Sequence, residues 1–145
     1  MKGLIFMLLC AASLSIGAFA QTGSATSDEA PIDSRYQACL DEPVNQSTVG
    51  QLDCARAAAD QWSAVVDQSY QLLLSKLTPD GRKSLAAAQK AWAAYRDREA
   101  SFSARLYYSE MEGTMWHVVN ANRYYEMVRT RARELQSYLD DFADR

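Results

Sequence analysis

The feature that most constrains the fold is a long apolar stripe between residues 52 and 77. Its members fall at steps of three and four residues: Leu52, Ala55, Ala59, Trp62, Val66, Tyr70, Leu73 and Leu77. Such spacing places every member on one face of an α-helix, because one turn takes 3.6 residues. A helix with one apolar face must pack that face against other elements. Ser47 or Thr48 is suited to cap its start.

Two more long helices are predicted after it. "TPDG" (78–81) ends the first helix and begins the second, with Thr78 as N-cap and Pro79 at the first helical position. The second stripe consists of Leu85, Ala88, Trp92, Tyr95, Phe102 and Leu106. After a break at "YYSEMEGT" (107–114), Thr114 is expected to cap the third helix. The third stripe consists of Val118, Ala121, Tyr124, Val128, Ala132, Leu135, Leu139 and Phe142.

No segment alternates polar and apolar residues over any length, so no β-sheet is expected. Short connections between long helices make sequential helices antiparallel. A shorter helical piece, "RYQACLDE" (35–42), precedes Pro43. We therefore predict an all-α fold, a small antiparallel bundle of three long helices plus a short N-terminal helix, forming one domain at 35–143.

The first twenty residues have the order of a secretory signal peptide. Lys2 precedes the apolar stretch "LIFMLLCAASLSIGA", and "AFA" (18–20) places small residues before a cut at Gln21. An uncleaved membrane anchor is the alternative, because the uncharged run approaches spanning length. Cys10 follows two leucines instead of small residues, which argues against lipid attachment. "QTGSATSDEAPIDS" (21–34) is small, polar and aperiodic, which predicts a flexible tether.

After cleavage the chain would be periplasmic or secreted, without stable membrane insertion, and mildly acidic. Loss of Lys2 takes the Lys and Arg count from 15 to 14, against 18 acidic residues. This surplus argues against general nucleic-acid binding, which needs cationic side chains for the phosphates. Cys39 and Cys54 remain as an even pair in an exported domain, which predicts a disulfide; two free buried thiols are the alternative.

Signals of catalysis are thin. His117 is the single histidine, and the sequence suggests no Ser/His/Asp or Cys/His arrangement. Glu112 and His117 lie on different sides of any helix, which disfavours a metal site. Glu110 and Glu112 resemble a carboxylate pair for glycoside cleavage, but a short loop favours solvated acids. We therefore expect no enzyme, no metal and no cofactor.

The segment "YYSEMEG" (107–113) combines residue types that are common at protein interfaces. Its two tyrosines offer rigid contact area, and its two acids offer charge for steering. The candidate partner-binding residues are Tyr107, Tyr108, Glu110, Met111 and Glu112. The alternative is that the tyrosines only cover the end of the bundle.

"AQKAWAAYRDREA" (88–100) carries more polar groups than a packing face needs. Four of its residues follow steps of three, four and three and share one helical face: Gln89, Trp92, Arg96 and Glu99. On such a face Arg96 can fork onto an acid of a neighbouring helix. Candidate acceptors recur every seven residues on the preceding helix: Asp53, Asp60 and Asp67. We interpret this face as structural, with a ligand-binding face as the alternative.

"RTRAR" (129–133) is the one basic cluster. We interpret it as a solvated helix face, with Arg131 and Arg133 near Glu134 and the acids that follow. Contact with an anionic wall polymer or a protein partner is the alternative.

Six segments follow one another along the chain in a characteristic order: "ACL" (38–40), "LDCARAAADQ" (52–61), "DQSYQLLLSKL" (67–77), "QKAWAAYRDREA" (89–100), "GT" (113–114) and "RARELQSYL" (131–139). With them, the chain from Tyr36 to about Tyr138 resembles the LprI-like family of exported helical proteins, named for a lipoprotein described as a lysozyme inhibitor. The resemblance implies a recurring motif, interpreted here as structural, at Gln89, Trp92, Arg96 and Asp97. It also matches the Cys39–Cys54 pair with the family's first bridge.

This chain departs from the family pattern at its second cysteine pair. Ala100 stands where the first of these cysteines is expected, and its partner would lie near Asn122 or Arg123. The later helices must therefore be held by packing alone. We expect the lipid anchor of the namesake to be absent as well.

The resemblance implies a binding protein that inhibits lysozyme-type, peptidoglycan-cleaving enzymes by protein–protein contact. An acidic inhibitor would be steered towards a basic lysozyme. The alternative is an envelope structural or immunity-type partner of another exported protein, with no lysozyme involvement. An exposed apolar patch around Trp116, Tyr124 and Tyr125 would favour that alternative.

Overall fold

The structure is a computed structural model that describes residues 29–144. The signal peptide expected at 1–20 and the first part of the expected tether lie outside the described residues. Within them the chain is helical, with no strand. The elements are α1 (Glu29–Asp41), the short helix η1 (Pro43–Asn45), α2 (Thr48–Lys76), α3 (Pro79–Arg105), the π-helical turn η2 (Leu106–Glu110) and α4 (Met115–Ala143).

Side-chain caps determine where α2 and α3 begin. Ser47 Oγ accepts a hydrogen bond from Gly50 N at 3.1 Å, and Thr78 Oγ1 accepts one from Gly81 N at 3.3 Å. Each cap satisfies a backbone N–H that has no partner inside its helix. Pro79 stands at the start of α3, where its missing N–H costs nothing. Both predicted caps are confirmed.

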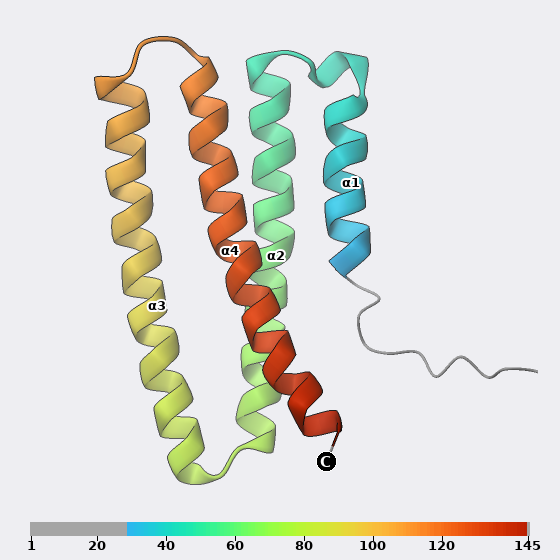
Figure 1. The fold of residues 1–145 in the computed structure, drawn as a ribbon, viewed down its shortest axis with the longest axis vertical. Helices are drawn as coiled ribbons and strands as arrows, with labels where there is room; N and C mark the ends of the chain where they lie inside the picture. The colour runs from blue at the N-terminus through green and yellow to red at the C-terminus, as the bar shows by residue number, and fades with distance from the viewer. Residues whose placement is uncertain (1–28, 145) are drawn as a thin grey trace, which may run out of the picture.

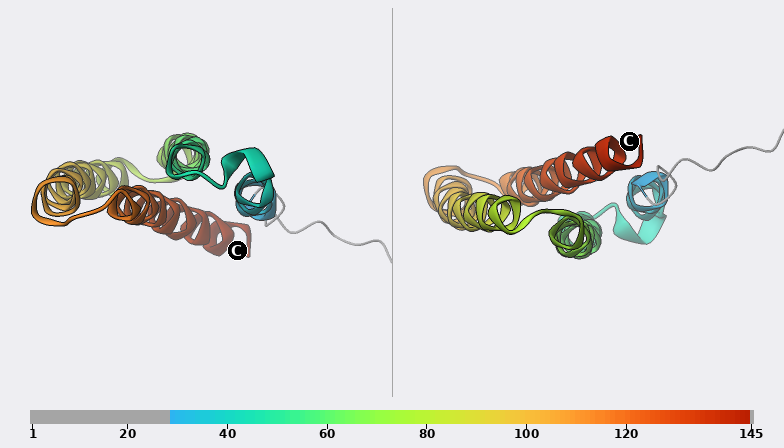
Figure 2. Two further views of the ribbon diagram at one scale, coloured as in Figure 1. Left: turned by 90° about the horizontal axis from the view of Figure 1, so that it is seen from above. Right: turned by 90° about the horizontal axis from the view of Figure 1, so that it is seen from below.

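The helices form an uneven bundle (Figures 1 and 2). Helices that follow one another in sequence run antiparallel, as predicted, which leaves α2 and α4 parallel to each other. These two parallel helices make the most extensive contact in the molecule, and α1 packs along the first half of α2. α3 lies on the outer side of α4, and it comes close to α4 and to α2 at only a few points. The all-α prediction is therefore confirmed, but three helices, α1, α2 and α4, build the core.

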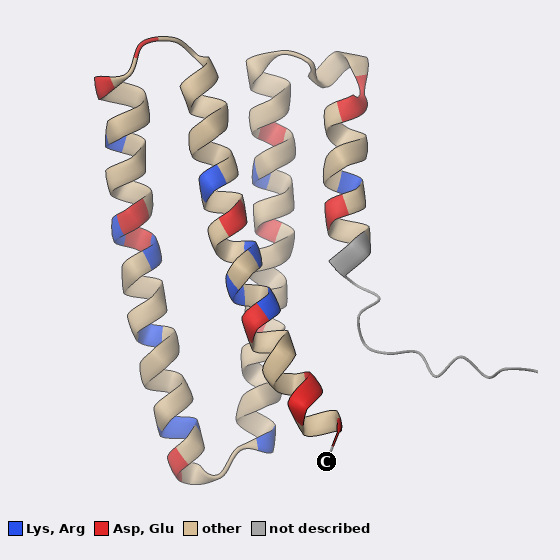
Figure 3. Cartoon of the chain, in the orientation of Figure 1, with Lys and Arg blue, Asp and Glu red and all other residues tan. Residues whose placement is uncertain are grey.

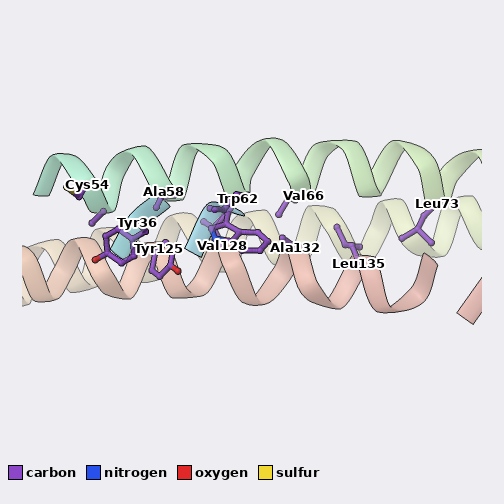
Figure 4. Packing of buried hydrophobic residues seen from close by; sticks show 13 residues of the cluster. Tyr36, Cys54, Ala58, Trp62, Val66, Leu73, Tyr125, Val128, Ala132 and Leu135 are labelled. Carbon is purple, nitrogen blue, oxygen red and sulfur yellow. The ribbon is translucent and has the colours of Figure 1, made fainter. Parts of the chain in front are cut away.

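The core lies where α2 and α4 face each other (Figure 4). Trp62 and Leu73 of α2 and Val128 and Leu135 of α4 are fully buried. Most members of the predicted stripes of both helices lie in this core or pack against it, and every member is buried or half-buried. Burial of side chains of this size stabilises the fold by about 1.5–3 kcal/mol each.

α1 begins earlier than predicted, at Glu29, inside the stretch 21–34 that we expected to be a flexible tether. Ile32 and Tyr36, one turn apart, are buried in the core. The Tyr36 ring centre lies 4.8 Å from that of Tyr125 on α4. The stretch is only weakly amphipathic. Tertiary contacts therefore keep residues 29–34 helical, and the predicted tether was too long by these residues.

The predicted disulfide between Cys39 and Cys54 is present and joins the end of α1 to the start of α2. The sulfur of Cys54 lies in the core, since this residue is only 2% exposed. Closing a loop with a sequence separation of 15 contributes about 3 kcal/mol in the chain-entropy description. The bridge thus holds α1 next to α2 at one end of the bundle.

α3 is helical as predicted, but it buries little of its apolar stripe. Ala88, Tyr95 and Phe102 are exposed, and Ser103 is its one buried residue. The spacing predicted the helix correctly and the packed face incorrectly. The reason is that α3 approaches both α4 and α2 at only a few points, so only a narrow face is covered.

Candidate protein-interaction site

The connection between α3 and α4 is the site proposed from the sequence, and much of its backbone is helical. Residues 106–110 continue α3 as a π-helical turn, so the loop is limited to 111–114. The predicted break at 107–114 therefore begins too early. Gly113 adopts φ 97°, a left-handed conformation that glycine takes without strain, and turns the chain into α4. Thr114 precedes α4 as predicted, but its side chain makes no capping hydrogen bond.

Two aromatic contacts hold the tyrosines of this segment against α4. The Tyr107 ring stacks on Trp116 at 5.7 Å between centres, and the Tyr108 ring meets His117 at 4.3 Å. Aromatic pairs of this kind contribute about 0.5–1.5 kcal/mol beyond their buried area. Tyr107 is half-buried, whereas Tyr108 stays 44% exposed. The tyrosines therefore cover the start of α4 and also present an ordered surface.

The remaining candidate residues of the segment are exposed. These are Glu110, Met111 and Glu112. The Glu110 carboxylate lies 3.8 Å from the Arg105 guanidinium, an exposed pair that contributes little to stability. Glu112 forms no ion pair with any residue from 29 to 144. Both carboxylates are thus accessible to a partner.

Gln89 and Trp92 of the polar face on α3 meet α4 through a single arginine. Arg131 is buried, and its Nε and Nη2 donate to Gln89 Oε1 at 3.0 and 2.9 Å. Its guanidinium carbon also lies 5.7 Å from the Trp92 ring centre. Its third nitrogen pairs with Glu134 on the same helix at 2.7 Å. The N–H groups of a buried arginine need partners. For Arg131, α3 supplies two of these partners, the Gln89 oxygen and the Trp92 ring.

Arg96 does not reach α2, so this part of the prediction was wrong. Its Nε and Nη2 donate to the adjacent Asp97 at 2.9 and 2.7 Å. Glu99 instead accepts a hydrogen bond from Arg123 of α4 at 3.4 Å. The acceptors that we expected on α2 are all exposed: Asp53, Asp60 and Asp67. The physical reason is that this polar face of α3 meets α4, where Gln89 accepts from Arg131 and Glu99 accepts from Arg123.

The basic cluster of α4 (129–133) was interpreted as a solvated helix face, but its arginines contact neighbouring helices. Asp33 of α1 accepts hydrogen bonds from Arg129 Nη2 at 2.6 Å and from Arg133 Nη2 at 3.0 Å. Arg131 is buried on the side of α3. The pairing of Arg131 with Glu134 agrees with the prediction. The cluster thus joins α4 to α1 on one side and to α3 on the other.

Asp33 is the point at which α1 joins both other core helices. Its carboxylate also accepts from the Tyr125 hydroxyl at 2.6 Å and from Trp62 Nε1 at 3.3 Å. Burial acts to raise the pKa of Asp33, but hydrogen bonds from Arg129 and Tyr125 and the charges of Arg129 and Arg133 outweigh it, so this pKa lies below 3.8. The pKa of Tyr125 is raised by burial and by the hydrogen bond to Asp33.

Sequence reasoning missed Asp33 because this residue lay inside the predicted tether. The signal that could have revealed it is the pair Ile32 and Tyr36, which flank Asp33 at helical spacing. Two apolar residues four apart indicate a turn of helix with one buried face. A short acid between them would then lie at the edge of that face.

The described residues hold little that favours other kinds of site. Between residues 29 and 144 no three His, Cys, Asp or Glu side chains are placed to bind a metal together. No helix of this part of the chain is long and apolar enough to cross a membrane. The apolar patch that would favour another envelope partner is not exposed either, since Tyr125 is buried and Trp116 and Tyr124 are half-buried.

Fold and contacts define a small all-α protein, closed by a disulfide near its beginning, with an ordered aromatic and acidic segment at one end. The chain belongs to the LprI family: the family model described as "Lysozyme inhibitor LprI" matches residues 39–135.

A solved structure has a similar fold. It is the crystal structure of an uncharacterized protein from Burkholderia thailandensis, with a TM-score of 0.73 and 33% sequence identity. The similarity covers 79% of this chain and 56% of that one, so this chain spans little more than half the length of the Burkholderia protein. A search of curated proteins gave no match.

Proposed function

We propose that this chain is an exported, periplasmic or secreted protein that inhibits a lysozyme-type, peptidoglycan-cleaving enzyme by binding to it. The observation that carries the proposal is the family match over residues 39–135, because the family is described as a lysozyme inhibitor. The disulfide agrees with this location, since disulfides persist outside the reducing cytoplasm.

The segment 107–112 is the contact region that we propose. Its aromatic side chains are already held by Trp116 and His117, so little conformational entropy is lost on binding. Met111 adds an adaptable apolar contact. Glu110 and Glu112 carry the charge that a basic lysozyme would attract. A segment of this kind inhibits by occupying the substrate cleft, which requires no chemistry of its own.

The first test replaces Glu110 and Glu112 together with alanine. We expect inhibition to weaken about tenfold while helicity stays unchanged, because both carboxylates are exposed and support no other part of the fold. The measurement is lysis of cell walls by a panel of purified lysozymes of different classes, with circular dichroism in parallel. Asp140→Ala with Asp141→Ala, at the other end of α4, removes the same charge and serves as the control.

Two results would contradict the proposal at different points. Full inhibition by the Glu110 and Glu112 double variant would reject the contact region. Failure of the mature wild-type chain to inhibit any lysozyme of the panel would reject the function itself.

A further inference from the structure

We infer that the surface that binds the lysozyme-type partner continues from segment 107–112 onto the α1–α2 corner (residues 41–50), with Val44 and Val49 as contact residues. This inference rests on the proposed function and adds a second contact region to it. The two regions lie at the same end of the bundle, where α1 turns into α2 and α3 turns into α4 (Figure 1).

Large apolar side chains are unusually exposed at this end. Val44 is 81% exposed and Val49 is 66% exposed, although neither contributes to the core. Across from them, Met115 is 64% exposed and Met111 is 37% exposed. When a partner covers apolar side chains that a monomer leaves in water, the free energy of the complex falls. A group of such side chains therefore marks an interaction surface.

The corner and the start of α4 form one continuous surface. Thr48 Oγ1 and Thr114 Oγ1 lie 3.4 Å apart, so the first residues of α2 and the residue before α4 are in contact. Between them lies an open pocket of about 280 Å³. Its lining includes Gln46 and Gln51 from the corner side and Met115 and Val118 from α4. A partner that contacts Met111 and Met115 therefore meets the corner as well.

The corner is held rigidly by polar contacts and close packing. Asn45 Nδ2 donates to the carbonyl of Cys39 at 2.9 Å, and Gln46 Nε2 donates to that of Leu40 at 2.7 Å. A Cβ on Gly50 would lie 2.4 Å from Asn45 Cα, so the two backbones are in direct contact. The disulfide fixes the same junction. A surface that is already ordered loses little entropy when a partner binds.

The charge of this end selects the kind of partner (Figure 3). The stretches 36–55 and 106–122 contain no lysine and no arginine. Their acidic residues are Asp41, Glu42, Asp53, Glu110 and Glu112; Asp53 pairs with Arg56, and Glu110 pairs with Arg105, both next to these stretches. Apolar side chains surrounded by acids suit a basic protein surface, and they disfavour an anionic membrane or an acidic protein.

The test replaces Val44 and Val49 together with serine and measures binding and inhibition with the lysozyme of the panel that the wild-type chain inhibits most strongly. We expect the Kd to rise about tenfold, mainly through faster dissociation, with the melting temperature unchanged. Leu72→Ser is the matched control, because Leu72 is 49% exposed on α2 away from this end. If the serine variant melts at a lower temperature, Val44→Thr with Val49→Thr keeps the branched shape and provides the same comparison.

The possible failures are distinguishable. If the wild-type chain inhibits and the Val44 and Val49 variants bind as tightly as it does, the corner is not part of the surface and the inference is overturned alone. An equal loss in Leu72→Ser would overturn it too, since the effect would not be local. If the wild-type chain binds and inhibits no lysozyme of the panel, the proposed function fails and this inference fails with it.

Discussion

Asp33 shows how one side chain can join three helices. It lies on α1, and its carboxylate accepts hydrogen bonds from Trp62 of α2 and from Tyr125, Arg129 and Arg133 of α4. A carboxylate has about four lone-pair positions, so these donors saturate it. Because the acceptor is charged, each of these hydrogen bonds is stronger than one between neutral groups.

Asp33→Asn tests this interpretation, since asparagine keeps the size and removes the charge. We expect the free energy of unfolding to fall by about 2 kcal/mol at neutral pH. The pKa of Asp33 in the folded chain lies below 3.8, so protonation favours the unfolded chain as the pH falls. The stabilisation is complete above about pH 4 and is lost below it. The difference between variant and wild type should therefore shrink in acid.

Urea unfolding at pH 7 and at pH 3 measures both effects. Asp60→Asn is the control, because Asp60 is an exposed acid on α2. A difference between Asp33→Asn and wild type that stays the same at both pH values would contradict the role of the charge.

α3 is the helix with the least apolar attachment. Its contacts with α4 are polar at Gln89, where Arg131 donates two hydrogen bonds, and at Glu99, which pairs with Arg123. The second contact lies beside Ala100, where the family resemblance led us to expect a cysteine. An ion pair between half-exposed side chains replaces little of the stability of a covalent bridge.

We predict that the amides of α3 exchange with solvent faster than those of α2 and α4. Helices with few buried apolar contacts open locally at low free-energy cost. Gln89→Leu should accelerate exchange in α3 about fivefold further, because it leaves Nε and Nη2 of Arg131 without their acceptor at a cost of about 1 kcal/mol.

Hydrogen exchange followed by mass spectrometry checks this expectation. Gln71→Leu, at an exposed position of α2, is the control. Protection of α3 equal to that of α2, or equal exchange in Gln89→Leu and wild type, would show that the polar contacts do not limit opening.

The charges of the molecule as a whole are unevenly distributed (Figure 3). Arginines occupy the middle of α4, where Asp33 and Gln89 pair with them. The end that carries segment 107–112 and the α1–α2 corner holds acids without lysine or arginine over 36–55 and 106–122. A basic partner approaching the bundle is therefore drawn towards that end.

Association kinetics should reveal this polarity. We expect the association rate constant with a basic C-type lysozyme to fall about tenfold between low and high salt, while dissociation changes less. Asp41→Asn with Glu42→Gln should slow association more than Asp140→Asn with Asp141→Gln, which neutralises two charges at the far end of α4. Stopped-flow measurements check this. Equal slowing by both variants would show that net charge acts without regard to position.

Sequence alone was sufficient for the features that depend on neighbouring residues. The stripes of α2 and α4, the caps Ser47 and Thr78 and the pairing of Cys39 with Cys54 were all predicted correctly. Apolar periodicity and capping chemistry are local, and the two cysteines that follow the predicted signal peptide allow one bridge. The segment 107–112 was also chosen from its composition, and its role stays a prediction.

The tertiary structure alone determines which helices pack together and which polar side chains meet, because local sequence patterns leave both open. It pairs α2 with α4 in parallel, extends α1 back to Glu29 and lets Arg131, instead of Arg96, join α3 to its neighbour. Gln89 and Arg131 are 42 residues apart, and Asp33 and Arg133 are 100 apart. Contacts over such separations depend on which helix faces meet, and that is settled by burial of the whole core. No short stretch of sequence, of the length used to recognise a helix or a cap, contains both partners of such a contact.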